Sequence, residues 1–381
     1  MQRIKLFIPI ILLATISCIE QFTPKYEKEL TNKYIITGEI NDIEGYQYIT
    51  ISMTSPIDKP NFLPLTDCIV EVHDDKDNKF IFSEFEDGKY RSYINGNFLV
   101  PGTSYKVRIE TPAGETIESD YDQMPICPNI DNVYYERVDL PTSNPNEFLN
   151  GIQFYVDVKG SENDSRFYRW EIVETFEYHS FYPIQIYYDG RLNKIEPDYS
   201  KYYCYQTQPV KNIYTVNTSS LLNNNYKKLP LHFVDNTTQK LQHQYSIEIT
   251  QFALSNEAYT YWNQLQQNAT DQGGLFDRQP FNVISNLKST KNSEVKVLGF
   301  FYACSKKSKR YFFSNIPNLN FNFFGMCEPQ KLEMGFSPYS PEDYPVYCVI
   351  MEDGSLGVAS SQCFDCTLLG GTTTKPTFWP N

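Results

Sequence analysis

The chain has 381 residues, a formal net charge of −13 and an aromatic content of 15%, with 30 tyrosines. Such acidity argues against sequence-independent nucleic-acid binding, which depends on neutralising phosphates. The length exceeds what one hydrophobic core usually supports, and the abundance of Tyr and Phe favours pleated, half-buried surfaces. We therefore expect two domains built mainly from β-strands.

Residues 1–17 have the pattern of an export signal. Arg3 and Lys5 precede a short apolar run, which is followed by small residues and then Cys18. Bacterial lipoprotein processing attaches lipid to a cysteine in this position, although Thr15 stands where that signal usually has Leu. We predict a lipoprotein signal peptide and lipidation at Cys18, with an ordinary secretory signal as the alternative. Two or more acyl chains give stable membrane attachment.

Residues 18–32 are polar and charged, which is typical of a spacer between the lipid and the fold. Residues 33–126 contain closely spaced strand patterns and predict a β-sandwich that resembles immunoglobulin-like and carboxypeptidase-regulatory-like modules. In "CIVEVHD", Cys68 and the two valines alternate with Ile69, Glu and His, which predicts a strand with one buried face. The next stretch, "DDKDN", predicts a hairpin turn. A calcium loop is the alternative, but the usual ligand spacing is lacking.

The domain boundary is predicted within the proline-containing stretch "MPICPNID", and residues 127–381 predict a larger β-rich domain. Long aromatic strands are expected at "NVYYERV", "GIQFYVDVKG", "RFYRWEIVETFEY" and "SIEITQFAL". One amphipathic helix is expected over 255–274, capped by Ser255 or Asn256 and ended by a glycine pair. Its apolar stripe consists of Ala258, Trp262, Leu265 and Ala269.

The basic run "SKKSKR" at 305–310 separates two apolar strand patterns in this acidic chain. Its position predicts a polar hairpin loop. A contact with lipid phosphates or an acidic partner is the alternative.

Eight cysteines follow Cys18, and an even number in an exported protein permits disulfides. The candidates are Cys68, Cys127, Cys204, Cys304, Cys327, Cys348, Cys363 and Cys366. The Cys363–Cys366 pair has the spacing of redox and zinc half-sites, but neither a redox βαβ context nor a second close ligand pair accompanies it. We expect structural disulfides with the connectivity left open.

A pair of disulfides to distant cysteines would fasten the C-terminus better than a bond within this short motif. The tail is then expected to pack Phe378 and Trp379 into a groove of the second domain. An exposed adhesive patch is the alternative.

The sequence shows no recognisable catalytic signature. The four histidines form no zincin motif, no serine lies in a nucleophile elbow, and no glycine-rich loop has phosphate-binding form. We predict that the protein is not an enzyme and that it carries no metal or cofactor. A hydrolase whose site is assembled from distant residues is the less favoured reading, which a His–carboxylate pair in a deep cleft would support.

Several stretches together are similar to one family. They are Cys18 with "EQFTP" after it, "MTSPI", "YKVRIETPAGETIESD", "EAYTYWNQLQQNATDQGGLFD", "VLGFFYACS" and the closing "CFDCTLLGGTTTKPTFW". They resemble the Bacteroidetes outer-membrane lipoproteins grouped as domain of unknown function 4249. Cys304 departs from the pattern, because a small polar residue is expected there. The resemblance implies no established reaction, and only Cys18 is carried over as a functional residue.

Members of this family commonly occur beside TonB-dependent receptors, so the resemblance implies an accessory role in nutrient uptake at the outer membrane. The leading hypothesis is a lipid-anchored, non-enzymatic binding or accessory protein whose ligand is a nutrient such as a glycan or a peptide. The alternative is a cell-surface adhesin or a structural protein of the envelope. The sequence does not favour either face of the outer membrane.

Overall fold

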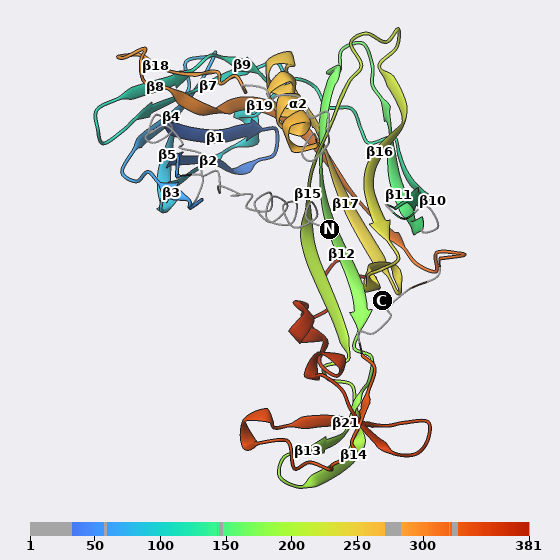
Figure 1. Ribbon diagram of the computed structural model, residues 1–381. Helices are drawn as coiled ribbons and strands as arrows, with labels where there is room; N and C mark the ends of the chain where they lie inside the picture. The colour runs from blue at the N-terminus through green and yellow to red at the C-terminus, as the bar shows by residue number, and fades with distance from the viewer. Residues whose placement is uncertain are drawn as a thin grey trace, which may run out of the picture.

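The computed structural model describes residues 33–56, 59–142, 144, 148–270, 283–319, 321 and 327–380. The predicted signal, Cys18, the spacer and the glycine pair after the helix lie outside these residues. The described chain is mainly β, as predicted, with a sandwich, a central pair of sheets and a distal module (Figure 1). Within it, no helix has the length and apolar character needed to cross a membrane.

The N-terminal sandwich consists of two sheets that share one strand. Its strands are β1 (Tyr34–Asn41), β2 (Gly45–Met53), β3 (Leu63–Pro64), β4 (Ile69–Asp74), β5 (Lys79–Glu86), β6 (Lys89–Ile94), β7 (Ser104–Glu110), β8 (Thr116–Ser119) and β9 (Asp122–Gln123). One sheet runs β1-β2-β6-β5 and the other β5-β4-β7-β8. The predicted alternation in β4 is present, because Val70 and Val72 are fully buried whereas Ile69 is 56% exposed.

The turn between β4 and β5 is the predicted hairpin tip. The buried Asp74 carboxylate accepts hydrogen bonds from the backbone N–H groups of Lys76 and Asn78, and from the Asn78 side-chain amide. An aspartate that bonds its own turn in this way stabilises the reversal of the chain. The turn itself therefore uses one of the three carboxylates on which the calcium alternative depends.

The longest strand, β19 (Val297–Phe313), connects the sandwich to the central sheet. Residues 297–304 pair in parallel with β1, and 305–313 pair antiparallel with β17 (Tyr245–Ala253). In addition, β18 (Leu287–Ser289) pairs with β8. These residues lie in the range 127–381 that is predicted as the second domain, whereas their pairing with β1 and β8 adds them to the sheets of the sandwich. Parallel pairing of distant segments leaves no local sequence signal, which explains the difference.

The basic run at 305–310 lies inside β19, so the predicted hairpin loop is wrong. Three of its cations have acidic partners nearby: Lys306–Glu39 at 3.6 Å, Lys307–Asp42 at 3.7 Å and Arg310–Glu248 at 2.6 Å. The charges are therefore compatible with a paired strand. Polarity alone does not distinguish a loop from the solvent-facing part of a strand.

Gly299 is where β19 comes closest to β1. Its φ is +93°, and an added Cβ would lie 1.9 Å from the carbonyl oxygen of Ile36. We expect Gly299→Ala to disrupt the parallel pairing and to lower the free energy of unfolding by about 2–4 kcal/mol, as measured by urea denaturation.

Gly102→Ala is the matched control for this substitution. Gly102 has a φ of +94°, but an added Cβ would meet nothing within 4 Å. Only the backbone strain remains there, so a loss of about 1 kcal/mol is expected. Equal losses in the two variants would show that the close approach to β1 is not what makes Gly299 necessary.

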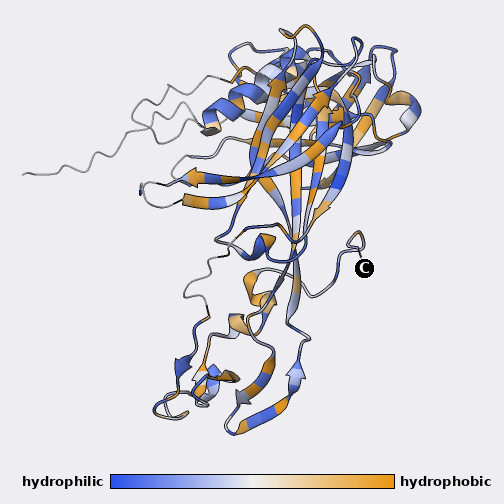
Figure 2. Cartoon of the chain, turned by 90° about the vertical axis from the view of Figure 1, so that its right-hand side faces the viewer, coloured by the Kyte–Doolittle hydropathy of each residue, from blue (hydrophilic) through white to orange (hydrophobic). Residues whose placement is uncertain are grey.

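The central part of the molecule is a pair of packed sheets. One contains β15 (Tyr203–Asn217), β12 (Phe167–His179), β17 and β19, and the other contains β10 (Asn132–Pro141), β11 (Phe148–Lys159) and β16 (Asn225–Asp235). Phe154 of β11 stacks on Tyr245 of β17 with ring centroids 5.6 Å apart, and both residues are fully buried. Apolar and polar residues alternate along the long strands of the molecule (Figure 2). The strands predicted from the aromatic stretches are confirmed as β10, β11, β12 and β17.

The predicted helix is α2 (Asn256–Thr270), which lies beside the sandwich and the long strands (Figure 1). The Ser255 hydroxyl accepts a hydrogen bond from the backbone N–H of Ala258 at 3.1 Å, so Ser255 is the N-cap. Ala258 is fully buried, Trp262 and Leu265 are half-buried, and Ala269 is exposed. The predicted apolar stripe is therefore covered by the protein at three of its four positions.

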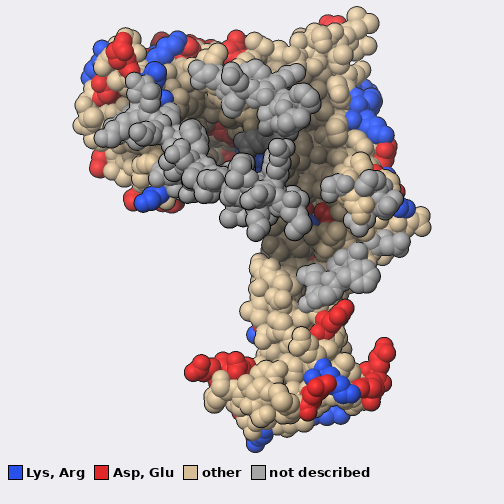
Figure 3. All heavy atoms as spheres, viewed as in Figure 1, with Lys and Arg blue, Asp and Glu red and all other residues tan. Residues whose placement is uncertain are grey.

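The distal module combines a hairpin from the middle of the chain with the C-terminal segment. Its sheet contains β13 (Ile184–Tyr188), β14 (Leu192–Asp198), β20 (Gln330–Lys331), β21 (Val346–Ile350) and β22 (Leu356–Val358). Among the described residues, the 3₁₀ helices are η2 (Gly96–Phe98), η3 (Gln239–Leu241), η4 (Pro341–Asp343), η5 (Ser361–Cys363) and η6 (Cys366–Leu369). Charged side chains are common on the module and sparse on the narrow region above it (Figure 3).

The C-terminal tail packs against the central sheet. Trp379 is 5% exposed, and its ring centroid lies 5.4 Å from that of Tyr205 and 5.7 Å from that of Phe312. Phe378 is 40% exposed, and the Arg310 guanidinium lies 3.7 Å from its ring centroid. The predicted packing of the tail is therefore present for Trp379, whereas Phe378 stays at the surface.

Candidate functional site

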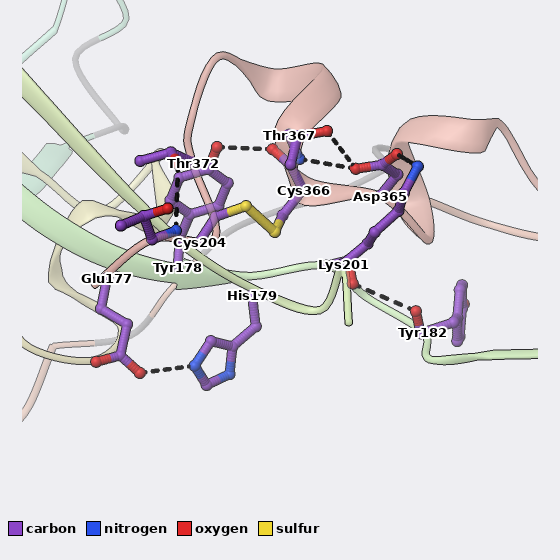
Figure 4. The surroundings of a disulfide bond; sticks show 12 residues. Glu177, Tyr178, His179, Tyr182, Lys201, Cys204, Asp365, Cys366, Thr367 and Thr372 are labelled. Atoms are coloured by element: carbon purple, nitrogen blue, oxygen red, sulfur yellow. Dashed lines mark hydrogen bonds and ion pairs between the residues drawn. A yellow bond between two sulfur atoms is a disulfide. The ribbon is translucent and has the colours of Figure 1, made fainter. Parts of the chain in front are cut away.

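Two disulfides tie down the C-terminal segment. Cys204 is bonded to Cys366 and Cys327 to Cys363, with sequence separations of 162 and 36 residues. Beside the first bond, the Tyr178 hydroxyl donates to the carbonyl oxygen of Cys366 at 2.8 Å (Figure 4). Both cysteines of the C-terminal motif are therefore bonded to distant partners and not to each other.

The other four candidate cysteines are free thiols. They are Cys68, Cys127, Cys304 and Cys348, and all four are buried. Burial raises the pKa of Cys68 and Cys348 to about 11, and that of Cys127 to about 12. Because the thiolate is the reactive form, these side chains act as small apolar groups in the protein interior. An even cysteine count does not reveal which of the residues are paired.

Three histidines contact glutamates. The pairs are His73–Glu71, His179–Glu177 and His232–Glu174, at 3.1, 2.9 and 3.2 Å. The first two pairs join residues two apart on one strand, and His179–Glu177 lies close to the Cys204 disulfide (Figure 4).

Glu174 is the buried member of the third pair. Besides His232, it accepts hydrogen bonds from Lys240 at 2.6 Å, Gln208 at 2.6 Å and Tyr245 at 2.7 Å. Burial acts to raise the pKa of Glu174, but these four donors outweigh it and lower the pKa to about 2. A carboxylate bound by four donors is a weak base, so this pair has the properties of a structural group.

A pocket of about 220 Å³ lies where the sandwich, the central sheet and α2 meet. Its lining residues are Thr37, Gly38 and Glu39 of β1, Tyr48 of β2, Arg169 and Glu171 of β12, Tyr261 and Trp262 of α2, and Phe300 and Tyr302 of β19. Half of these residues are aromatic, and three carry a formal charge. The distal module has larger hollows of about 480 and 510 Å³, but the polar groups described next distinguish the smaller pocket.

Arg169 is the buried cation of this pocket. Its side chain is 4% exposed, and its Cζ lies 4.1 Å from the ring centroids of both Phe252 and Trp262. A guanidinium against aromatic faces is stabilised electrostatically, and the effect grows as water is removed. The two rings therefore fix the guanidinium inside the protein.

Two glutamates balance this charge, and a neutral tyrosine hydroxyl links the guanidinium to one of them. Arg169 Nη1 donates to Glu171 at 2.6 Å, and Nη2 donates to the Tyr302 hydroxyl at 3.3 Å and lies 3.8 Å from Glu39. The Tyr302 hydroxyl in turn donates to Glu39 at 2.6 Å. Burial alone would lower the pKa of Arg169, but the carboxylates of Glu171 and Glu39 raise it, so the guanidinium is charged.

Two buried donors in the pocket lack a hydrogen-bond partner. Four buried side-chain polar atoms are unpartnered in the part of the chain that the structure describes, and two of them are Arg169 Nε and Trp262 Nε1. An unpaired buried donor costs about 1–3 kcal/mol, so natural proteins rarely leave one without water or a ligand. Both atoms are closed off from solvent, so they lie in the wall behind the pocket surface and do not face its opening.

Sequence reasoning missed this site. Trp262 was identified only as part of the helix stripe, while Arg169 and Glu171 lie within a predicted strand and Glu39 lies in another domain. No local motif contains these residues, because the pocket is formed where four segments distant in sequence meet. The one available signal was an arginine between aromatic residues in "RFYRWEI".

The sequence places this mainly β protein in a known family. Residues 19–310 match the domain of unknown function DUF4249, and the chain belongs to that family. No curated protein matches the chain. Among solved structures, trypsin-activated alpha-2-macroglobulin from Escherichia coli aligns at 7% identity with a TM-score of 0.20, over 60% of this chain and 15% of that one. A likeness this weak carries no argument.

Proposed function

We propose that the protein is an outer-membrane lipoprotein of Bacteroidetes, anchored through Cys18, that binds a nutrient without chemical conversion. It works beside a TonB-dependent transporter in uptake. The signal pattern before Cys18 supports the anchor, and the resemblance to lipoproteins of this family supports the location and the partner.

The observation that carries the binding role is the aromatic pocket with its fixed charged groups. Tyr48 and Glu171 are exposed at a junction that a ligand can reach from outside, and the buried Arg169 guanidinium holds Glu171 in place. Aromatic walls with a few fixed polar groups are the usual composition of small-molecule sites. By contrast, the buried Glu174 carboxylate is saturated by its own neighbours.

The anchor gives a direct prediction. Cells fed a palmitate analogue are expected to label the wild-type protein, and Cys18→Ser is expected to abolish the label and release the protein from membranes. Cys68→Ser serves as a control because Cys68 is a buried thiol, so its variant is expected to keep the label. A label that persists in Cys18→Ser would contradict the proposed anchor.

The partner is tested by affinity capture from detergent-solubilised outer membranes at native abundance. The proposal expects a TonB-dependent receptor to be captured with the wild-type protein. Capture of the protein without any such receptor would contradict the accessory role. It would not affect the proposed binding role, which ligand-binding experiments test separately.

A further inference from the structure

We propose that the pocket around Arg169 binds one ring of a neutral saccharide. This inference rests on the binding role proposed above and specifies the chemical class of the ligand. It is carried by three properties of the pocket: its balanced charge, its aromatic lining, and a free carboxylate acceptor next to that lining.

The charge balance disfavours an ionic ligand. Glu39 and Glu171 face Arg169, and Lys306 lies 3.6 Å from Glu39, so two cations balance two anions. A bound anion would meet both carboxylates, and a bound cation would meet the guanidinium. A ligand without net charge avoids both repulsions.

The aromatic lining requires a ligand with an apolar face. Tyr261 stacks on Phe300 with centroids 4.8 Å apart, and Trp262 and Tyr302 lie next to them. Tyr48 completes the lining from β2 and is 50% exposed, so its ring remains free to cover a ligand. The C–H face of a sugar ring packs on such surfaces, whereas a fully polar molecule gains little from them.

A free polar group of the pocket matches hydroxyl groups. Glu171 is 57% exposed, and only one of its carboxylate oxygens is bonded to a described residue, which leaves the other as an acceptor. A hydroxyl group of a sugar ring can donate to this oxygen while the ring packs on the neighbouring aromatic side chains.

The volume limits the ligand to a single ring inside the pocket. Sites for drug-sized molecules usually measure about 300–1,000 Å³. The value of about 220 Å³ lies below that range, so the rest of an oligosaccharide would extend along the surface beyond the pocket.

Isothermal titration calorimetry of the full mature chain in detergent tests this inference. The probes are methyl glycosides of glucose, galactose, mannose and xylose, with neutral tripeptides and inorganic phosphate as the competing classes. At least one glycoside is expected to bind. Glu171→Gln and Tyr48→Ala are each expected to weaken that binding about tenfold, through a lost charged acceptor and a lost stacking face.

Tyr93→Ala is the matched control, because Tyr93 is an exposed sandwich tyrosine at 57% exposure outside the pocket. It is expected to bind the glycoside as the wild type does. Binding of a tripeptide or phosphate but of no glycoside would overturn the saccharide assignment and leave the binding role intact. Glycoside binding that is unchanged in both pocket variants would overturn the assignment of the site.

Discussion

Replacing Cys204 and Cys366 together by serine is expected to lower the free energy of unfolding by about 2–5 kcal/mol. This bond closes the longer of the two loops, at 162 residues, and chain entropy assigns about 5 kcal/mol to a loop of that length. The bond also secures Asp365, whose carboxylate lies 2.6 Å from Lys201 (Figure 4), at the junction of the distal module with the long strands. Urea denaturation of the oxidised protein measures the loss.

Two further variants test whether the loss of stability comes from this disulfide bond. The double serine variant of Cys327 and Cys363 opens a loop of 36 residues, for which the same estimate is about 4 kcal/mol, so its loss is expected to be the smaller one. Cys348→Ala removes a buried free thiol and is expected to cost about 1 kcal/mol. If the Cys204/Cys366 variant were no less stable than Cys348→Ala, the bond would not be what fastens the C-terminal segment.

The second large effect is expected from Glu174→Gln, at about 3–5 kcal/mol of unfolding free energy. The substitution leaves Lys240 and His232 facing a neutral amide inside the central sheets, and a buried charge without its partner is costly. Adding Lys240→Met to this variant is expected to restore part of the loss. Glu248→Gln, at a more exposed ion pair with Arg310, is expected to cost less than about 1 kcal/mol.

The same carboxylate predicts a pH dependence. The pKa of Glu174 falls from 4.5 to about 2 on folding, so its contribution of about 3 kcal/mol is fully present above pH 4.5. It is lost as the pH decreases towards 2, because the unfolded chain then binds the proton more readily. In denaturation experiments between pH 6 and pH 2, the wild type is expected to lose more stability than Glu174→Gln. Parallel curves for the two proteins would contradict the assignment.

The sequence predicted those parts of the fold that depend on local patterns. The alternation in β4, the hairpin tip at Asp74 and the Ser255 cap all involve neighbouring residues, and the structure has each of them. Local patterns do not predict that β19 continues through its lysines, because the partners of those lysines are distant in sequence. They do not predict the disulfide connectivity for the same reason, since the spacing of cysteines does not show which chain segments meet.

The candidate site could not be predicted from any local pattern. Arg169 forms the site only together with Glu39 from the sandwich and Trp262 from α2. Both contacts arise because β19 brings β1 beside the central sheet. Without the parallel pairing of β1 and β19, these residues appear as ordinary members of strands and a helix. The pocket is therefore a property of the topology.

The measurement that tests the central claim most directly is native mass spectrometry of the protein isolated from membranes of cells grown on complex medium. The account predicts a small-molecule adduct on the wild type that Trp262→Ala loses and Trp379→Ala keeps, because both indoles have a buried unpartnered Nε1 but only Trp262 lines the pocket. A wild-type protein without an adduct, or an equal adduct on all three proteins, would contradict it.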